Sequence, residues 1–184
     1  MKKIIAVIGD NSVDKGSIVY NTAFQVGKVL IDKGYRIQSG GLGGVMEAVF
    51  AGAHSSDNYL DGDTIAIIPS FDRTQANIYA DIIIPSGLDV MRNTLVANAD
   101  AVIAIGGGAG TLSEMAIAWS LYRLIIAFKN VYGWSSKLAD KPIDTRIRYD
   151  IPNDRVYGVE SAAEMVQVLD DNIERYNRVH HGIK

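Results

Sequence analysis

The chain has 184 residues, and its composition of 48% hydrophobic, 21% charged and 8% aromatic residues is typical of soluble globular proteins. At about 100 to 200 residues per domain, this length favours one compact domain over two. Lys and Arg total 18 against 21 for Asp and Glu, so the net charge of -3 excludes a global positive field that would draw the chain to nucleic acid. The lack of Cys excludes disulfides, thiolate metal sites and a Cys nucleophile.

The N-terminal segment predicts a strand and not a signal peptide. Its apolar run, Ile4 to Ile8, is shorter than the roughly 7 to 15 apolar residues of a signal peptide. No stretch approaches the ~18 consecutive apolar residues of a membrane span. Since the lack of Cys also favours a reducing compartment, we expect a cytoplasmic protein.

In the first half of the chain, short β-branched runs alternate with segments of helical period, which is typical of βαβ units on a parallel sheet. The first strand is predicted at Lys3 to Ile8, and a helix runs from the N-cap Ser17 to the C-cap Gly34. The next predicted elements are strands at Tyr35 to Gln38, Thr64 to Ile68 and Asp81 to Ile84, a helix at 44–54 and a polar connector at 70–80.

The second half continues the alternation. A helix is predicted over Leu88 to Ala99, where the apolar residues Val90, Met91, Leu95, Val96 and Ala99 have helical spacing. The later elements are strands at Ala101 to Ile105, Leu124 to Phe128 and Arg155 to Val159, a helix at Thr111 to Arg123, a loop-rich segment at 129–154, and a terminal helix from a capping box at Ser161 to about Arg178. Together these elements predict one α/β domain over residues 1–184, with a Rossmann-like, mainly parallel sheet of about six or seven strands and helices on both faces.

Three predicted strands end in loops rich in glycine or small polar residues, namely Gly9 to Ser12, Ser39 to Gly44 and Gly106 to Thr111. In a parallel sheet these loops lie along one edge, where ligands bind at the switch in strand order. Glycine allows backbone N–H groups to approach a ligand, and a following helix N-terminus favours an anion. Tight turns alone would also explain glycine in any one loop. The convergence of three such loops favours a phosphate-binding site.

Several common sites are excluded by their spacing. No segment reads G-x-x-x-x-G-K-[ST], and the first strand does not lead into G-x-G-x-x-G, which argues against a Walker P-loop and weakens an NAD site. His54, His180 and His181 do not form a metal set, so no metal site is expected.

Two charged residues stand out near the third glycine loop. Thr111 to Glu114 is either a capping box, in which Glu114 bonds the Thr111 backbone, or the source of a catalytic carboxylate. Arg92 lies between apolar Met91 and Leu95, so it is either a surface residue or a side chain turned toward the sheet edge.

The segments that carry these features resemble the LOG-like Rossmann superfamily. It contains cytokinin riboside 5'-monophosphate phosphoribohydrolases, proteins labelled lysine decarboxylase-like, and molybdenum cofactor carriers. The resemblance extends to about Arg123 and lies in Ser39–Met46, Met91–Asn93 and Gly106–Glu114. Gly106 stands where the hydrolase branch has Pro, and Asn93 where it has Lys. Both departures look more like the carrier branch.

The resemblance implies one of two functions. The first is cleavage of the N-glycosidic bond of a nucleoside 5'-monophosphate, with Arg92 and Glu114 as the catalytic pair and no required cofactor. The second is non-hydrolytic binding of a phosphorylated nucleotide or a molybdopterin-type cofactor. The residues expected to hold phosphate or nucleotide are Gly9, Ser12, Gly40, Gly41, Gly43, Gly107, Gly108, Gly110 and Thr111. No nucleic acid or membrane partner is expected.

The resemblance also implies a homo-oligomer, either a dimer or a tetramer. The apolar helices predicted at 88–99 and 111–123 are candidates for the interface, because a helix buried on both sides is apolar all round. A tightly covered single-chain core would produce the same pattern.

Overall fold

The computed structural model describes residues 1–182, and its centre is an all-parallel sheet of seven strands in the order β4-β3-β2-β1-β5-β6-β7. This confirms the predicted α/β class and the Rossmann-like sheet. The strands are β1 (Ile4–Gly9), β2 (Arg36–Ser39), β3 (Thr64–Ile68), β4 (Ile82–Pro85), β5 (Ala101–Ile105), β6 (Leu124–Phe128) and β7 (Tyr157–Val159).

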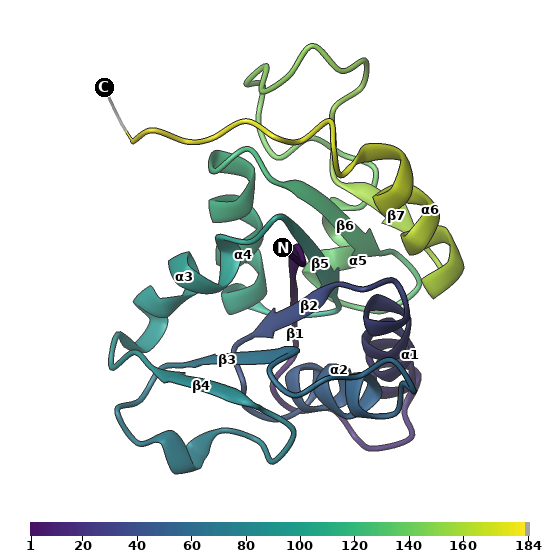
Figure 1. Cartoon of the computed structure of the whole chain (residues 1–184). Coiled ribbons are helices and arrows are strands. Elements are labelled where there is room, and N and C mark those ends of the chain that lie inside the picture. Colours follow the sequence, from purple (N-terminus) through teal and green to yellow (C-terminus); the bar gives the residue numbers. More distant parts are fainter. Residues whose placement is uncertain (183–184) are drawn as a thin grey trace.

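Helices cover both faces of this sheet (Figure 1). On one face lie α1 (Ile18–Asp32), α2 (Val45–His54) and α6 (Ala162–Asn172), and on the other α3 (Asn93–Ala97), α4 (Ala109–Ser120) and α5 (Trp134–Leu138). Two short 3-10 helices, η1 (Arg73–Gln75) and η2 (Asp89–Arg92), flank β4.

The side-chain alternation of the strands divides the core into two layers. In β1, Ile5 and Val7 pack with α1 and α2, whereas Ala6 and Ile8 pack with α3 and α4. The fully buried strands β3, β5 and β6 are apolar on both faces, as expected for parallel strands covered by helices.

The strand order reverses at β1, which lies between β2 and β5. The carboxyl ends of these three strands are therefore neighbours, and the three glycine-containing loops that follow them meet at one edge. Ligands bind at such a switch point in open α/β sheets.

Predicted caps at two helix starts are confirmed. The Ser17 hydroxyl accepts from the Tyr20 amide at the start of α1, and the Ser161 hydroxyl accepts from the Glu164 amide at the start of α6. Gly34 follows α1 with a φ of +81°, as a C-terminal glycine should.

The predicted helix over 88–99 is wrong in extent. The Asp89 amide donates to the Pro69 carbonyl and its φ is +49°, so the chain cannot enter a regular helix there. A 3-10 turn and five residues of α-helix replace the predicted helix, and they expose Val90, Met91 and Leu95.

Two further boundaries differ from the prediction. Helix α4 begins at Ala109 instead of Thr111, because the Leu112 amide already donates to the Gly108 carbonyl. Helix α6 ends at Asn172 instead of Arg178, because the chain turns there to bury Tyr176.

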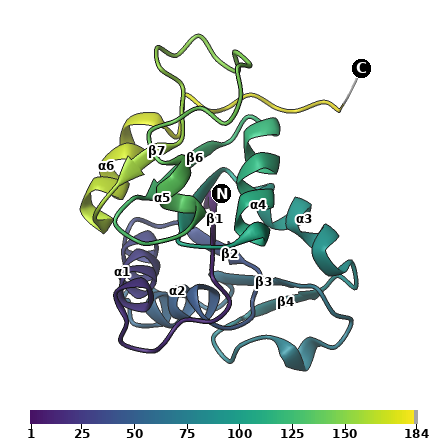
Figure 2. The same cartoon turned by 180° about the vertical axis from the view of Figure 1, so that it is seen from behind.

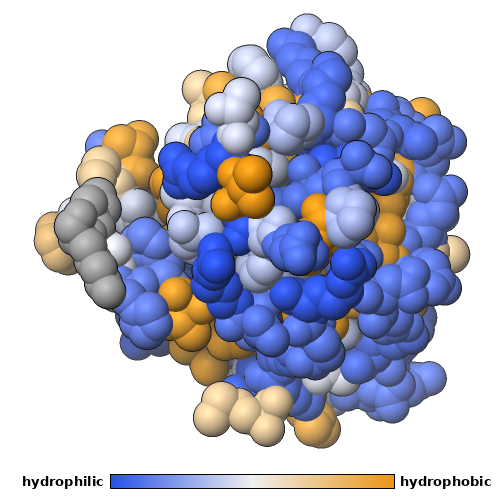
Figure 3. Space-filling view, turned by 90° about the horizontal axis from the view of Figure 1, so that it is seen from above, coloured by the Kyte–Doolittle hydropathy of each residue, from blue (hydrophilic) through white to orange (hydrophobic). Residues whose placement is uncertain are grey.

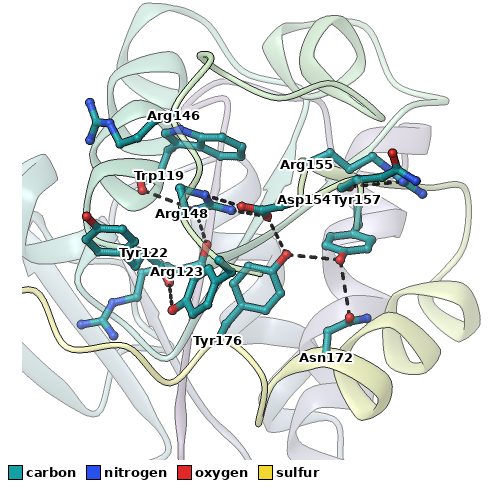
Figure 4. A network of polar contacts seen from close by, with 12 residues as sticks. Trp119, Tyr122, Arg123, Arg146, Arg148, Asp154, Arg155, Tyr157, Asn172 and Tyr176 are labelled. Atoms are coloured by element: carbon teal, nitrogen blue, oxygen red, sulfur yellow. Dashed lines mark hydrogen bonds and ion pairs between the residues drawn. The ribbon is translucent and has the colours of Figure 1, made fainter. Parts of the chain in front are cut away.

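The buried Arg148 explains this turn and anchors the end of the loop-rich segment, which also contains α5 (Figure 4). Its guanidinium lies 3.5 Å from the Trp119 ring centre and donates to both carboxylate oxygens of Asp154 at 2.7 and 2.9 Å. The Tyr176 hydroxyl donates to the same carboxylate at 2.6 Å. The end of α4, the segment before β7 and the C-terminal segment are thus held together by a charge-assisted network.

Helices α1 and α2 lie side by side (Figures 1 and 2), and glycine permits their closest approach. A Cβ atom on Gly27 would overlap the Val49 carbonyl, and one on Gly52 would overlap the Phe24 carbonyl. The two backbones are therefore in direct contact.

The apolar side chains of η2 and α3 form a surface that the single chain leaves uncovered. Val90 is 70% exposed and Met91 64%, and Leu95 is exposed beside them. Ile82 and Ile84 of the edge strand β4 are also exposed. On the face shown in Figure 3, hydrophilic residues predominate and apolar residues are scattered.

We expect Gly27→Ala to lower the free energy of unfolding by about 1 to 3 kcal/mol, because the added methyl forces two helix backbones apart. At about 2 to 4 °C per kcal/mol for a chain of this size, thermal denaturation would detect the change. An unchanged or higher melting temperature would contradict a backbone-to-backbone contact at this position.

The uncovered side chains of η2 and α3 predict self-association, since exposed apolar surface of this kind marks interaction sites. We expect light scattering of the purified chain to give two or four times its 20.0 kDa mass. Leu95→Asp should shift the population toward single chains. A single-chain mass for the parent protein would show that this surface does not pair copies of the chain.

Candidate functional site

A cavity of about 250 Å³ opens at the switch point, between the loops that follow β1, β2 and β5. It is lined by Ile8, Gly9, Asp10, Asn11, Ser39, Gly40, Leu42, Met46, Arg92, Asn93, Gly108, Gly110, Thr111 and Glu114. Of the residues singled out from the sequence, the cavity brings together Arg92, Glu114, Gly9, Gly40, Gly108, Gly110 and Thr111.

The loop after β1 ties the two glycine loops together. The Asp10 carboxylate accepts a hydrogen bond from the Gly107 amide at 2.9 Å, and the Asp10 carbonyl accepts one from the Val45 amide at 2.9 Å. The Asn11 side-chain oxygen accepts from the Gly43 amide at 3.1 Å. Asp10 and Asn11 thus fix the position of both loops around the cavity.

The N-terminus of α4 forms one wall of the cavity. Gly108 is its N-cap and provides no side-chain cap, and Thr111 lies buried in the first turn. The amides of Ala109, Gly110 and Thr111 precede the first intrahelical hydrogen bond, so helix geometry gives them no acceptor within α4. This wall presents backbone donors and partial positive charge.

Gly110 lacks the structural reasons that explain most other glycines. Its φ is not among the positive values, and apart from its chain neighbours and its own helix backbone no described atom lies within 4 Å of where its Cβ would stand. Glycine inside a helix is less stable than alanine by roughly 0.5 to 1 kcal/mol. Open space in front of Gly110 is therefore kept at some cost in stability.

Arg92 and Glu114 form an ion pair in the wall of the cavity. The Arg92 Nη1 donates to Glu114 Oε1 at 3.1 Å, and the two side chains are only 11% and 8% exposed. A Cβ on Gly40 would lie 2.5 Å from Arg92 Nη2, so this glycine makes room for the guanidinium. Glu114 is not the second half of a capping box, since its carboxylate turns to Arg92.

Burial sets the electrostatics of this pair. It raises the pKa of Glu114 to about 7, because the ionised carboxylate loses hydration, and the neighbouring Arg92 charge only partly opposes this. Near neutral pH the carboxyl group therefore populates both protonation states. Such a perturbed group in a cavity is typical of functional sites.

Asn93 is a cavity residue that was not among the expected site residues. Its side-chain amide donates to the Ser113 hydroxyl at 2.7 Å, which in turn donates to the Gly110 carbonyl at 2.7 Å. Asn93 thereby couples α3 to the first turns of α4. The wall also has an apolar part, formed by Ile8, Leu42 and Met46. Neither the strand pattern nor the loop composition of the sequence indicated these three residues as part of a site.

Four expected ligand residues do not line the cavity: Ser12, Gly41, Gly43 and Gly107. Ser12 lies in the exposed part of its loop. A Cβ on Gly41 would meet the Ala66 side chain of β3, so close packing explains this glycine. The amides of Gly43 and Gly107 already donate to Asn11 and Asp10.

Within the described part of the chain, no three or more His, Cys, Asp or Glu side chains come together as metal ligands would. Among residues 1–182, no helix combines the length and apolar character needed to cross a membrane.

Solved structures with this fold include two that match almost the whole chain at 28% identity. TM1055, a structural genomics target, has a TM-score of 0.78 and covers 92% of this chain and 99% of its own. The molybdenum cofactor binding protein of Rippkaea orientalis has a TM-score of 0.75, with 94% and 98% covered. The molybdenum cofactor carrier protein of Chlamydomonas reinhardtii is 22% identical with a TM-score of 0.73 and 92% and 98% covered, which shows a shared fold.

A protein of Archaeoglobus fulgidus is 41% identical over 115 residues, which are 62% of this chain and 72% of that protein. The model of the SLOG cluster4 family matches residues 2–157, which include every residue that lines the cavity. These matches confirm the resemblance to the LOG-like Rossmann superfamily on the side of the molybdenum cofactor carriers. The chain belongs to the SLOG cluster4 family.

Proposed function

We propose that the chain binds a phosphorylated small molecule of the nucleotide or molybdopterin type in this cavity and carries it without cleaving it. The observation that supports this most directly is the unfilled space at Gly110, beside backbone donors that have no acceptor in their own helix. A phosphate group is the ligand that such a helix N-terminus favours.

In this proposal the phosphate accepts hydrogen bonds from the first amides of α4 and from the Thr111 hydroxyl. Arg92, which also lines the cavity, contributes positive charge. The Asp10 carboxylate is turned to the Gly107 amide, which gives it a structural role at the site. Leu42 and Met46 add an apolar wall beside the anion site.

The backbone at Gly106 favours carriage over hydrolysis. Its φ is +66°, whereas the pyrrolidine ring of proline fixes φ near -65°. The loop therefore follows a path that the proline of the hydrolase branch cannot adopt. Asn93, in place of the hydrolase lysine, is used to hold Ser113 of α4. The Rippkaea orientalis protein, which binds molybdenum cofactor, is similar along nearly the whole chain.

The Arg92–Glu114 pair supports a second candidate, hydrolysis of a nucleoside 5'-monophosphate. Departure of the base would leave an oxocarbenium-like ribosyl centre, which the Glu114 carboxylate would stabilise while orienting a water for attack. Arg92 would hold the ribose or phosphate in place. The water oxygen bonds to the ribosyl carbon, and the base leaves with the glycosidic electron pair and a proton.

Gly110→Ala tests the binding proposal, since it should raise stability and weaken binding at the same time. The methyl gains up to about 1 kcal/mol of helix stability, which is about 2 to 4 °C in melting temperature. It also fills the space reserved for phosphate, so affinity for molybdenum cofactor and for nucleoside 5'-monophosphates should fall at least about tenfold. Calorimetric titration and thermal denaturation measure the two effects.

The matched control for this variant is Gly34→Ala, at a glycine that follows α1 and does not line the cavity. Its φ of +81° is strained for alanine, so this variant should lower stability and leave affinity unchanged. If Gly110→Ala binds these ligands as tightly as the parent, the phosphate does not lie against α4. If the parent binds neither ligand class, the proposed function fails.

Incubation with nucleoside 5'-monophosphates, followed by assay of free base and ribose 5-phosphate, separates the two candidates. We expect binding without release. Should hydrolysis occur, its rate must rise about tenfold from pH 6 to pH 8, because the ionised fraction of Glu114 grows through its pKa of about 7. Glu114→Gln, which keeps the shape of the side chain, would abolish that reaction. Base release with this profile would replace carriage by hydrolysis.

A further inference from the structure

An exposed aromatic side chain stands beside the third glycine loop, outside the cavity already described. Tyr132 follows β6 and is 89% exposed, although its neighbours Val131 and Gly133 are buried. Most of this ring therefore faces water and is accessible to a ligand.

The turn that carries Tyr132 is fixed to the glycine loop by backbone contacts. The Trp134 amide donates to the Gly107 carbonyl at 2.9 Å, and the Ser135 amide donates to the Gly106 carbonyl at 3.0 Å. The buried Ser135 hydroxyl accepts from the Gly106 amide at 2.8 Å and donates to the Phe128 carbonyl at 2.7 Å. The backbone that carries the ring is therefore held next to the residues that precede α4.

Close packing confirms that this contact is rigid. Gly133 has a φ of +140°, and a Cβ there would lie 2.6 Å from the Gly107 nitrogen. The two loops thus touch backbone to backbone, one residue before the N-cap Gly108. An aromatic ring on such a turn is presented without a loss of loop entropy on binding.

A cation lies beside the same rings. The Lys137 ammonium is 4.7 Å from the Trp134 ring centre and 5.8 Å from the Tyr132 ring centre. These cation–π contacts hold Lys137 next to the aromatic pair. A flat, electron-rich ring attached to an anionic group would meet both an aromatic face and a positive charge here.

We infer that Tyr132, with Trp134 and Lys137 beside it, is the stacking face for the planar heterocycle of the ligand whose phosphate lies at the N-terminus of α4. This inference rests on the proposed function and adds the part of the site that selects a ring. It assigns the phosphate to Gly108–Thr111 and the purine-like or pterin-like ring to the turn after β6.

The test compares a ligand with a ring to one without. Affinities of Tyr132→Ala, Tyr132→Phe and the parent are measured by calorimetric titration for a nucleoside 5'-monophosphate and for ribose 5-phosphate. We expect Tyr132→Ala to weaken nucleotide binding about fivefold to 100-fold, the usual range for loss of one base–aromatic stack. Binding of ribose 5-phosphate should not change, and Tyr132→Phe should bind like the parent.

The remaining outcomes would overturn the inference, and each points to a different cause. Unchanged nucleotide affinity in Tyr132→Ala, or an equal loss for both ligands, would show that the ring does not stack on this residue. A parent that binds ribose 5-phosphate and nucleotide equally well would leave the phosphate site in place without a stacking face. A parent that binds neither would remove the proposed function itself.

Discussion

The hydrogen bonds made by Asp10 and Asn11 are the constraint on which the whole site depends. From one short loop after β1 they reach the Gly107 amide on one side and the Gly43 and Val45 amides on the other. They fix the distance between two glycine loops that come from strands on opposite sides of β1. They also give an acid in a site proposed for an anion a structural role, because the Asp10 carboxylate accepts a hydrogen bond from the Gly107 amide.

The groups around the cavity include local positive charge, although the net charge of the chain is negative. Its positive contributions are the Arg92 guanidinium and the N-terminus of α4. Burial holds the Glu114 carboxyl near the midpoint of its titration at neutral pH, so it cancels Arg92 only in part. These two contributions are what favours an anion in the proposed site. With a pKa of about 7, Glu114 would also supply an ionised carboxylate to the hydrolysis considered as the second candidate.

Glycines in this chain serve three different physical purposes. Gly27 allows two helix backbones to touch, and Gly106 and Gly107 adopt positive φ values in a turn. Gly108 and Gly110, which line the cavity, need neither: their φ values are not positive, and no atom outside their chain neighbours and their own helix backbone lies within 4 Å of where a Cβ would stand, so they suggest space for a ligand. The presence of glycine in a loop does not show which purpose it serves. The atoms that surround each Cβ position in the structure do show it.

Local chemistry by itself determined the strands and caps, because apolar runs and capping side chains act within a few residues. The strands at 64–68, 101–105 and 124–128 agree with their predicted bounds. Only the tertiary structure decided the rest: the break at Asp89, the end of α6 before Tyr176, and the expected ligand glycines that face away from the cavity. These depend on contacts between residues far apart in the chain, such as Asp10 and Gly107, which no local pattern encodes.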